Sequence, residues 1–417
     1  MPHYPEEGAI RFNPLRAWRP APGFAAKVAA PPYDVVNRAE AAALAHGNPL
    51  SFLHVGRAEI DLPADVDPYD SRVYLKAREN LHGFMAQGVL EQDRTPSLYV
   101  YEQTMNGRVQ AGVVGCVHID DYERDVIKKH EKTRPDKEDD RTRHTLTLNA
   151  NAEPVFLTYR AQPFINQAVA AVRNTPPRDD FTTNDGVRHR TWRVEDPRPL
   201  LDAFRRVPAA FVADGHHRCA SAWRAGKQLR EQSVRSSGNE EYNWFLAVMF
   251  PSDVLQILPY NRVVKDLGSH SPAEFLKALE GTGSLTQTDT PEPEAPGSFG
   301  IYLDGQWYRL TLDPATIRVD DPIASLDAML LQERILAPLL GVGDPRTDQR
   351  LDFVGGIRGT DALKERVDRG DAAVAFALYP TSLEQLLTVS AAGLIMPPKT
   401  TWFEPKLRSG LFVHTLD

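Results

Sequence analysis

The chain has 417 residues, of which 42% are hydrophobic and 25% charged, and its formal net charge is −8 at pH 7. This length and composition are typical of a globular protein with two domains or one elaborated domain. The acidic balance argues against a general nucleic-acid binder, because such binding needs clustered Lys and Arg to neutralise phosphates. The two cysteines, Cys116 and Cys219, stand in apolar surroundings and exclude a disulfide framework.

We expect a cytoplasmic protein without membrane attachment. No apolar run approaches the about 18 residues that a membrane-spanning helix needs. The first residues, MPHYPEEGAIRF, lack the basic and then apolar pattern of an export signal. Strand and helix patterns alternate irregularly along the chain, which favours a mixed α/β or α+β fold.

The first predicted elements are a stiff loop, for which an ordinary Pro-rich turn is the alternative, and a helix that serves as scaffold. In APPYDVV (residues 30–36) a Pro-Pro pair stiffens the loop, so the side chains after it have little entropy left to lose. The apolar spacing over residues 71–87 predicts a helix with Asp70 as its cap. Residues 96–119 predict a hairpin that turns at Asn106-Gly107.

The stretch VIKKHEKTRPDKEDDRTRHTLTLNANAEPVFLTY (residues 126–159) is dense in charge. His130-Glu131 resembles the start of a zinc-protease helix, but Arg134-Pro135 follows where the second His should be, which excludes that motif. A charge run is usually a solvated face. The functional alternative assigns His130 or Glu131 to proton transfer and one Asp of this stretch to Mg²⁺, the division of labour that phosphoryl transfer needs, and the pattern does not choose among Asp136, Asp139 and Asp140.

The stretch FVADGHHRCASAWR (residues 211–224) predicts a strand that turns into a helix. His216, His217 and Arg218 then lie at a helix N-terminus, where unpaired N–H groups and the helix dipole favour an anion such as a phosphate. Gly215 allows close approach, Arg218 can offer a bidentate fork, and Asp214 can cap the helix or bind a metal. The alternative is structural, with Asp214 as a simple N-cap and Arg218 in a surface ion pair.

Two more hairpins and a linker are predicted in the second half. WFLAVMF and VLQIL (residues 244–258) flank a Pro-Ser-Asp turn, and IYLDGQWYRLTL turns at Asp304-Gly305. Residues 281–300 are rich in Thr, Pro, Gly and Glu and predict a linker or long surface loop. We therefore place the main internal boundary between residues 265 and 300.

MPPKTTWFEPK (residues 396–406) holds Lys399 and Thr400 behind a second Pro-Pro pair. Lys399 can hold a phosphate there, and an ordinary Pro-rich turn is the alternative. Neither a GxxxxGK[ST] loop nor a convincing GxGxxG occurs in the sequence.

Four of these stretches, in order, resemble the bacterial family named domain of unknown function 1015. They are APPYDVVNRAEAAALAHGNPLSFLHV, KHEKTRPDKEDDRTRHTLTLNANAEPVFLTY, AAFVADGHHRCASA and IMPPKTTWFEPKLRSGL. The DGHHR stretch in turn resembles the phosphate-binding motif of the ParB/sulfiredoxin-like superfamily, which includes free-serine kinases. After the strand VLQIL, members of the domain of unknown function 1015 family are expected to have Thr-His-Arg, whereas this chain has Tyr260-Asn261-Arg262. If that His is catalytic in relatives, the activity of this chain is in doubt.

The resemblance implies a ParB/sulfiredoxin-like core with a mixed sheet flanked by helices. We expect the core in residues 1–265, with an inserted hairpin and acidic loop at about 60–200, and a C-terminal α/β region in 266–417 that packs back on it. It further implies a Mg²⁺-dependent kinase that uses ATP, ADP or CTP on a serine-like hydroxyl. The implied roles are catalysis for Glu131, His130 and Lys399, nucleotide binding for Asp214, Gly215, His216, His217, Arg218 and Thr400, substrate binding for Tyr33, Asp34 and Arg141, and metal binding for Asp140.

A second class of function fits the same motif. A regulatory module would bind or slowly hydrolyse a nucleotide, without kinase activity, and change partners. A kinase needs a second small-molecule pocket beside the terminal phosphate, whereas a switch needs a dimer surface that responds to nucleotide. A homodimer is compatible with both, and nucleic acid and membrane are expected partners of neither.

Overall fold

The computed structural model describes residues 8–234 and 237–417, and the chain in it forms two compact units. The first unit comprises Met1–Leu255 and Pro405–Asp417, and the second comprises Gln256–Glu404. The sequence predicted a division between residues 265 and 266, whereas the chain leaves the first unit after Leu255. Residues 281–300, the predicted linker or long surface loop, lie inside the second unit, where 283–287 form a strand, 288–297 form a loop and 298–300 begin the next strand. Residues 1–7, part of the segment that lacks an export pattern, lie outside the described residues.

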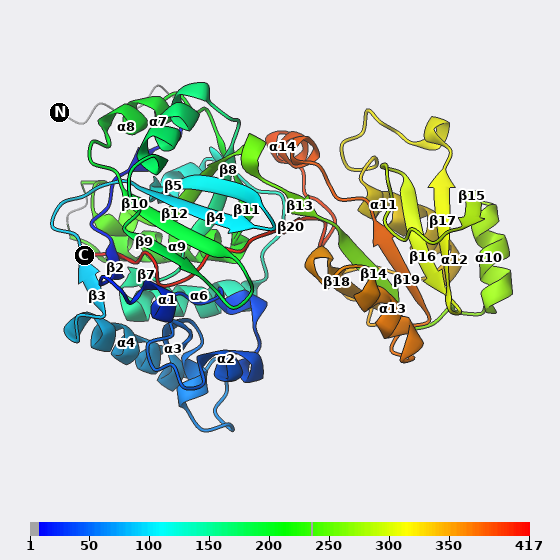
Figure 1. The fold of residues 1–417 in the computed structure, drawn as a ribbon, viewed down its shortest axis with the longest axis horizontal. Helices are drawn as coiled ribbons and strands as arrows, with labels where there is room; N and C mark the ends of the chain where they lie inside the picture. The colour runs from blue at the N-terminus through cyan, green and yellow to red at the C-terminus, as the bar shows by residue number, and fades with distance from the viewer. Residues whose placement is uncertain (1–7, 235–236) are drawn as a thin grey trace. The chain divides into compact units, whose positions relative to one another are not determined.

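The first unit is built on a nine-stranded mixed sheet (Figure 1). Its strand order is β6-β11-β8-β12-β5-β4-β10-β9, with β1 paired to β5, and the β6–β11 and β8–β12 pairs are parallel. Its strands are β1 (Phe12–Asn13), β4 (Tyr99–Met105), β5 (Arg108–His118), β6 (Ile127–Lys128), β8 (Val155–Tyr159), β9 (Asp179–Thr182), β10 (Arg188–Arg193), β11 (Ala210–Asp214) and β12 (Trp244–Pro251).

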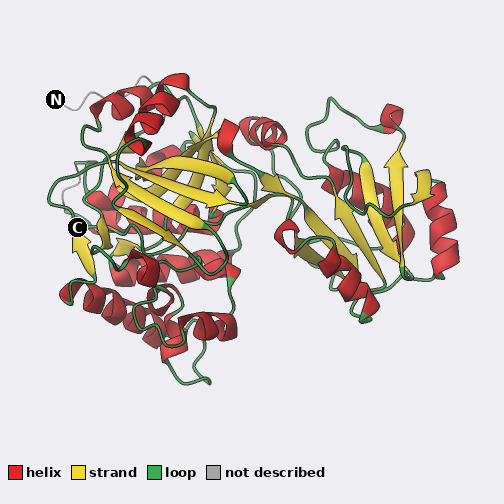
Figure 2. Cartoon of the chain, viewed as in Figure 1, coloured by secondary structure: helices red, strands yellow, loops and turns green. Residues whose placement is uncertain are grey.

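The helices of this unit pack around the sheet (Figure 2). They are α1 (Ala25–Val28), α2 (Arg38–Ala45), α3 (Leu53–Gly56), α4 (Ser71–Ala86), α5 (Ile119–Glu123), α6 (Pro135–Leu148), α7 (Pro163–Arg173), α8 (Arg198–Phe204) and α9 (His216–Gln232). Short 3₁₀ turns span Tyr33–Val35, Ala58–Asp61, Glu241–Asn243 and Ser252–Val254, and two small ribbons pair β2 (Trp18–Pro20) with β3 (Leu90–Gln92) and β7 (Ala150–Asn151) with β21 (His414–Thr415).

The main core lies between one face of the sheet and four helices. Phe245, Ala247 and Met249 alternate along β12, so they share a face, and they pack in one cluster with residues of α5, α7, α8 and α9. The segment 405–417 crosses the opposite face, where the side chain of Gln103 donates to the carbonyl of Lys406 (2.8 Å). The predicted mixed α/β fold, a mixed sheet flanked by helices, is confirmed.

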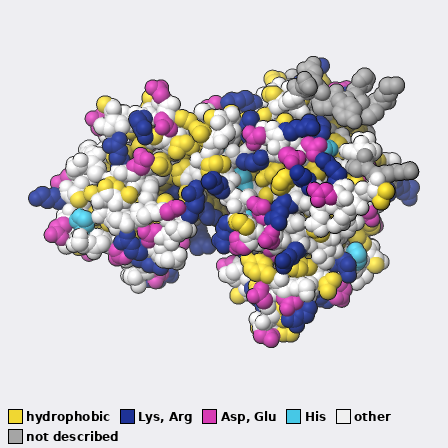
Figure 3. Space-filling model, turned by 180° about the vertical axis from the view of Figure 1, so that it is seen from behind, with side chains coloured by type: hydrophobic (Ala, Val, Ile, Leu, Met, Phe, Trp, Pro, Cys, Tyr) yellow, Lys and Arg dark blue, Asp and Glu magenta, His cyan; other side chains and the backbone are white. Residues whose placement is uncertain are grey.

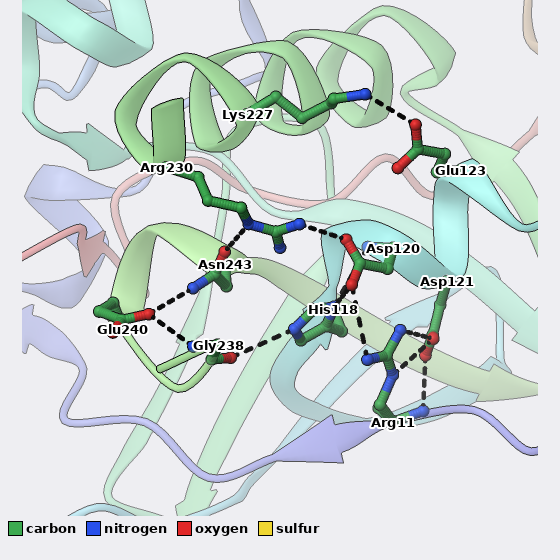
Figure 4. Close-up of polar contacts among 10 residues, drawn as sticks. All are labelled: Arg11, His118, Asp120, Asp121, Glu123, Lys227, Arg230, Gly238, Glu240 and Asn243. Atoms are coloured by element: carbon green, nitrogen blue, oxygen red, sulfur yellow. Dashed lines mark hydrogen bonds and ion pairs between the residues drawn. The ribbon is translucent and has the colours of Figure 1, made fainter. Parts of the chain in front are cut away.

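Polar side chains fix the second half of α9 (Figure 4). Arg230 donates from Nη1 to Asp120 (2.9 Å) and from Nε to Asn243 (2.7 Å). Lys227 donates to Glu123 (2.7 Å). These contacts tie α9 to α5 and to the turn before β12, and so fix where the helix begins at its other end.

The second unit has an antiparallel six-stranded sheet in the order β15-β17-β16-β19-β14-β18. Its strands are β14 (Tyr260–Val264), β15 (Gly283–Gln287), β16 (Ser298–Leu303), β17 (Gln306–Leu312), β18 (Leu351–Gly355) and β19 (Val374–Leu378), and β13 (Ile257–Leu258) pairs with β20 (Trp402–Phe403). Its helical segments are α10 (Pro272–Glu280), α11 (Asp327–Leu331), a π-helical turn (Gln332–Leu336), α12 (Ala337–Leu340), α13 (Asp361–Asp368) and α14 (Leu383–Ala391), with 3₁₀ turns at Pro314–Thr316 and Gly356–Arg358.

The cap of α4 and two tight turns, which form between residues adjacent in sequence, match the sequence prediction. Helix α4 is capped by Asp70, whose side chain accepts from Arg72 N–H (2.9 Å). The hairpin turns at Asn106-Gly107 and Asp304-Gly305 form, with positive φ at all four residues. The hairpin predicted for residues 244–258 was wrong. Strand β12 pairs with β5 and β8, and β13 pairs with β20 in the second unit.

Among the described residues, we find no helix with the length and apolar character needed to cross a membrane.

Candidate functional site at the start of helix α9

The site forms where strand β11 ends and helix α9 begins. Strand β6 runs parallel to β11, with Ile127 opposite Ala210 and Lys128 opposite Phe211. Because the two strands run in the same direction, the residues that follow β6 lie beside the residues that follow β11. Glu131 therefore lies next to the predicted phosphate motif, with its Oε2 3.7 Å from Nδ1 of His216.

Gly215 makes the turn from strand to helix. It is the N-cap residue of α9 and has φ 91°, a conformation that L side chains rarely adopt. A Cβ on Gly215 would lie 2.9 Å from Nε of Arg218. The sequence offered Asp214 as the cap, and this was wrong, because Gly215 occupies that position and α9 has no side-chain cap.

Asp214 forms ion pairs on both carboxylate oxygens. Arg218 Nη2 lies 2.7 Å from Oδ2, and Lys406 Nζ lies 3.1 Å from Oδ1. Burial by itself raises the pKa of Asp214, but Lys406 and Arg218 together outweigh it and hold the pKa at about 2. The carboxylate is therefore ionised at neutral pH.

Arg218 is buried and its guanidinium turns inward. Its side chain is 7% exposed, contacts Asp214, donates to the backbone carbonyl of Pro154 and lies 3.9 Å from Asp34. The predicted surface ion pair is thus a buried one. A single contact, from Nη2 to Oδ2, holds the protein's own carboxylate, and this makes Arg218 a residue that positions Asp214.

Two buried histidines lie behind Glu131. The rings of His130 and His216 meet edge to face, with centroids 4.4 Å apart. Burial lowers the pKa of each to about 3, so both are neutral at physiological pH. His130 is fully buried, whereas the Glu131 side chain is 34% exposed. Of the two residues predicted for proton transfer, Glu131 is the one that solvent reaches.

The N-terminal turn of α9 presents backbone donors. The first helical hydrogen bond runs from Cys219 N–H to Gly215 O (2.9 Å), and the preceding N–H groups of His216, His217 and Arg218 make none of the described backbone hydrogen bonds. The imidazole Nε2 of His217 accepts from Arg134 N–H (3.1 Å) and ties the loop before α6 to this turn.

A second group of predicted residues lies on the far side of Arg218. The Arg141 guanidinium sits over the Tyr33 ring, 4.1 Å from its centroid. Arg141, Arg218 and the carboxyl group of Glu153 line a cavity of about 30 Å³. Burial raises the pKa of Glu153, and Arg218 opposes the shift. Tyr33 is buried, whereas the side chain of Asp34 is 35% exposed.

Asp140 does not fit the predicted metal role. Its Oδ1 accepts from the Tyr74 hydroxyl (2.9 Å) and its Oδ2 from Arg141 Nε (2.8 Å), so both oxygens are engaged. Arg141 and Tyr74 lower the pKa of this buried carboxyl against the effect of burial. Over residues 8–234 and 237–417, no cluster of three or more His, Cys, Asp and Glu side chains is arranged to hold a metal ion.

Lys399 and Thr400 belong to the second unit. Lys399 has φ 56° and its Nζ lies 5.6 Å from the centre of the Tyr260 ring. Thr400 is buried and its hydroxyl donates to the carbonyl of Pro397 (2.6 Å). Their phosphate-binding roles remain predictions.

The sequence reasoning missed Lys406 and Glu153. Lys406 stands in the same motif as Lys399, seven residues later, and is the lysine that binds Asp214. Glu153 lies in the charged stretch at residues 126–159. Both were inside stretches that had been singled out, but their partners are distant in sequence and left no local signal.

Solved structures with a similar fold share little sequence with this chain. A free serine kinase in complex with AMP is 14% identical, covers 72% of this chain and 91% of its own, and gives a TM-score of 0.34. SbnI with a C-terminal truncation, from Staphylococcus aureus, is 13% identical over 72% and 87%, with a TM-score of 0.37. A conserved hypothetical protein from Pyrococcus furiosus is 14% identical over 74% and 97%, with a TM-score of 0.33. All three likenesses are distant.

None of the curated proteins matches the chain. The family model described as "Protein of unknown function (DUF1015)" matches residues 12–329. That span contains the first unit's nine-stranded sheet and the β6, β11 and α9 segments of the site, while Lys406 lies beyond it. The match covers well over half of the sequence, and the chain therefore belongs to the DUF1015 family.

Proposed function

We propose that the first unit binds a nucleotide at the start of α9 and transfers its terminal phosphoryl group to the hydroxyl of a small serine-like metabolite. One observation carries the proposal. A partly exposed carboxylate, Glu131, lies 3.7 Å from His216 at the N-terminus of a 17-residue helix. A base is thereby placed beside a position that favours phosphate.

The phosphates would bind the N-terminal turn of α9. The N–H groups of His216, His217 and Arg218 point along the helix axis, where the helix dipole adds to their attraction for an anion. The backbone can come close because Gly215 carries no side chain. Lys406 adds a positive charge beside Asp214. Lys399 and Thr400, in the second unit, take no part in this proposal.

Glu131 would act as general base. Its carboxylate takes the proton of the acceptor hydroxyl while that oxygen bonds to the terminal phosphorus. The bond from phosphorus to the bridging oxygen breaks, and the nucleotide leaves with one phosphate fewer. His216, neutral because burial lowers its pKa to about 3, orients the carboxylate without neutralising it.

The other predicted residues take supporting roles. The exposed carboxylate of Asp34 can bind the amino group of a serine-like substrate, and Tyr33 under Arg141 forms the floor beside it. Mg²⁺ on the nucleotide would supply neutralisation of phosphate charge, as it does in phosphoryl transfer generally. Asp140 has no metal-binding role in this proposal, because both of its carboxylate oxygens already accept hydrogen bonds.

Glu131→Gln tests the proposal. It keeps the shape and removes basicity, so phosphoryl transfer to serine should fall by about 10²–10⁴ while nucleotide affinity stays within about twofold. The matched control is Asp136→Asn, an exposed carboxylate in the first turn of α6 that binds Arg134. Transfer that is equal in both variants, or absent from the natural protein with every hydroxylated metabolite tried, would contradict the kinase proposal.

A nucleotide-binding regulatory module is the second candidate. The observation that favours it is that Arg218 and Lys406 both bind Asp214. Charges held in this way are less able to follow a transferring phosphoryl group. Calorimetry with ATP, ADP, CTP and GTP separates the candidates, because nucleotide binding without transfer supports the module and binding of none contradicts both.

A further inference from the structure

The second unit contains a hollow that the site at α9 does not involve. It has a volume of about 250 Å³ and lies beside β14 and β18, the segment that starts with α11, and the loop at residues 395–398. At about 30 Å³ per water, this is the space of roughly eight water molecules. Most of its lining is apolar, including Ile323, Ala328, Met329, Leu351, Met396 and Pro397.

One charged group is buried in this lining. Arg262 is 3% exposed, and its guanidinium donates to the carbonyls of Tyr260, Pro398 (3.3 Å) and Lys399 (3.0 Å). It also lies over the Phe353 ring, 4.9 Å from the centroid. Among the described residues, none of these partners of Arg262 is a carboxylate. Burial lowers the pKa of Arg262 to about 10.

A buried cation without a counter-ion is unfavourable, because it has lost its water and gained no opposite charge. The charges at the rim do not compensate it. Asp344 and Arg346 also line the hollow, and Asp344 accepts from Arg346 N–H (2.9 Å) and lies 3.9 Å from its guanidinium. Two cations and one carboxylate leave a net charge of +1.

The helix that faces Arg262 is irregular at the hollow. A π-helical turn begins at Gln332, and such turns are rare and frequent at functional sites. The Gln332 amide nitrogen donates to the carbonyls of Val342 (3.0 Å) and Gly343 (2.9 Å), while its Oε1 is buried without a hydrogen-bond partner. The hollow thus offers a cation inside a mostly apolar wall.

We propose that this hollow binds a small organic acid, with its carboxylate on Arg262 and its apolar body against Met329 and Met396. The volume admits a molecule the size of hexanoate. The neutral apolar wall selects against inorganic phosphate and against the polar body of a nucleotide.

The test is calorimetric titration of the full chain with hexanoate, compared with hexanamide, which has the same length and no charge. Hexanoate should bind at least about tenfold more tightly than hexanamide, and Arg262→Met should remove that difference. Arg346→Gln is the matched control at the rim and should change hexanoate affinity by less than about threefold. ATP should not compete.

A second variant keeps the test decisive if Arg262→Met does not fold. Ala328→Phe fills the hollow and leaves the guanidinium in place, so hexanoate binding should be lost. Hexanoate binding that survives either variant unchanged, equal binding of hexanoate and hexanamide, or no binding at millimolar concentration would overturn the proposal. Competition by ATP would instead assign the anion site to a nucleotide and overturn it as well.

Discussion

Lys406 Nζ lies 3.1 Å from Asp214 Oδ1, across 192 residues of sequence. Lys406 comes from the segment that returns to the first unit after the second unit is complete. The strand β11 supplies Asp214, and the helix that follows supplies Arg218 as its other partner. The carboxylate before α9 is therefore held by one residue of the same helix and by one residue near the C-terminus.

Lys406→Met should lower the free energy of unfolding by about 1.5–3 kcal/mol at pH 7, the range for a hydrogen bond to a charged group. Lys406→Arg, which keeps the charge, should restore most of it. Urea denaturation of both variants measures the effect. Equal stability of Lys406→Met and the natural protein would mean that the ion pair contributes nothing.

The same pair predicts a pH dependence. The pKa of Asp214 is about 2 in the folded chain, below its ordinary 3.8. The stabilisation, about 2 kcal/mol by linkage, is present above pH 4 and is lost as pH falls towards 2. Lys406→Met should make this loss smaller, since the folded pKa then lies closer to the unfolded one. A stability curve below pH 4 that is unchanged by the substitution would count against it.

Gly215→Ala should destabilise the protein by about 1–3 kcal/mol, because φ 91° strains an L residue and the new Cβ would lie 2.9 Å from Arg218. Gly107→Ala is the matched control. Gly107 also has positive φ, 77°, but nothing lies within 4 Å of its added Cβ. The difference between the two unfolding free energies isolates the contact with Arg218. A Gly107→Ala change as large as that of Gly215→Ala would show that backbone strain alone is responsible.

Local features of the sequence were enough to predict the turns and the start of α9. Asn106-Gly107 and Asp304-Gly305 need only their own positive φ values, and the strand-to-helix change at Gly215 follows from the local pattern of apolar residues. The proximity of Glu131 to His216 was also anticipated, through the resemblance that paired the two motifs.

Pairings between distant segments could not be predicted in this way. The sequence of β12 does not show which strands it pairs with. We therefore predicted a hairpin with the strand that follows it, whereas β12 pairs with β5 and β8. The burial of the Arg218 guanidinium could not be predicted either, because Pro154, whose carbonyl accepts from it, is 64 residues away in sequence. The mixed charge of the surface could be predicted from composition. In Figure 3, Lys and Arg lie among Asp and Glu on the first unit, in keeping with the net charge of −8.

Arg230→Ala should lower the free energy of unfolding by about 1–3 kcal/mol, because Asp120 and Asn243 each lose the hydrogen bond that they accept from Arg230 (Figure 4). Lys227→Ala is the control on the same helix. Its exposed pair with Glu123 should contribute less than about 1 kcal/mol. Thermal or urea unfolding distinguishes the two, and equal effects would contradict the assignment of Arg230 as the anchor of α9.

His216→Gln should flatten the stability profile between pH 3 and 6.5. Burial lowers the pKa of His216 from its ordinary 6.5 to about 3, so the unfolded chain takes up a proton in this range and the folded chain does not. Stability is therefore complete above pH 6.5 and falls as the pH drops towards 3. Without the imidazole, the chain takes up about one proton fewer on unfolding, which lowers the slope near pH 5 by about 1.4 kcal/mol per pH unit.

His82→Gln, on the exposed surface of α4, is the control and should leave the profile as it is. Urea titrations at several pH values give the slopes directly, and a His216→Gln slope equal to that of the natural protein would show that the buried ring does not titrate as the structure implies.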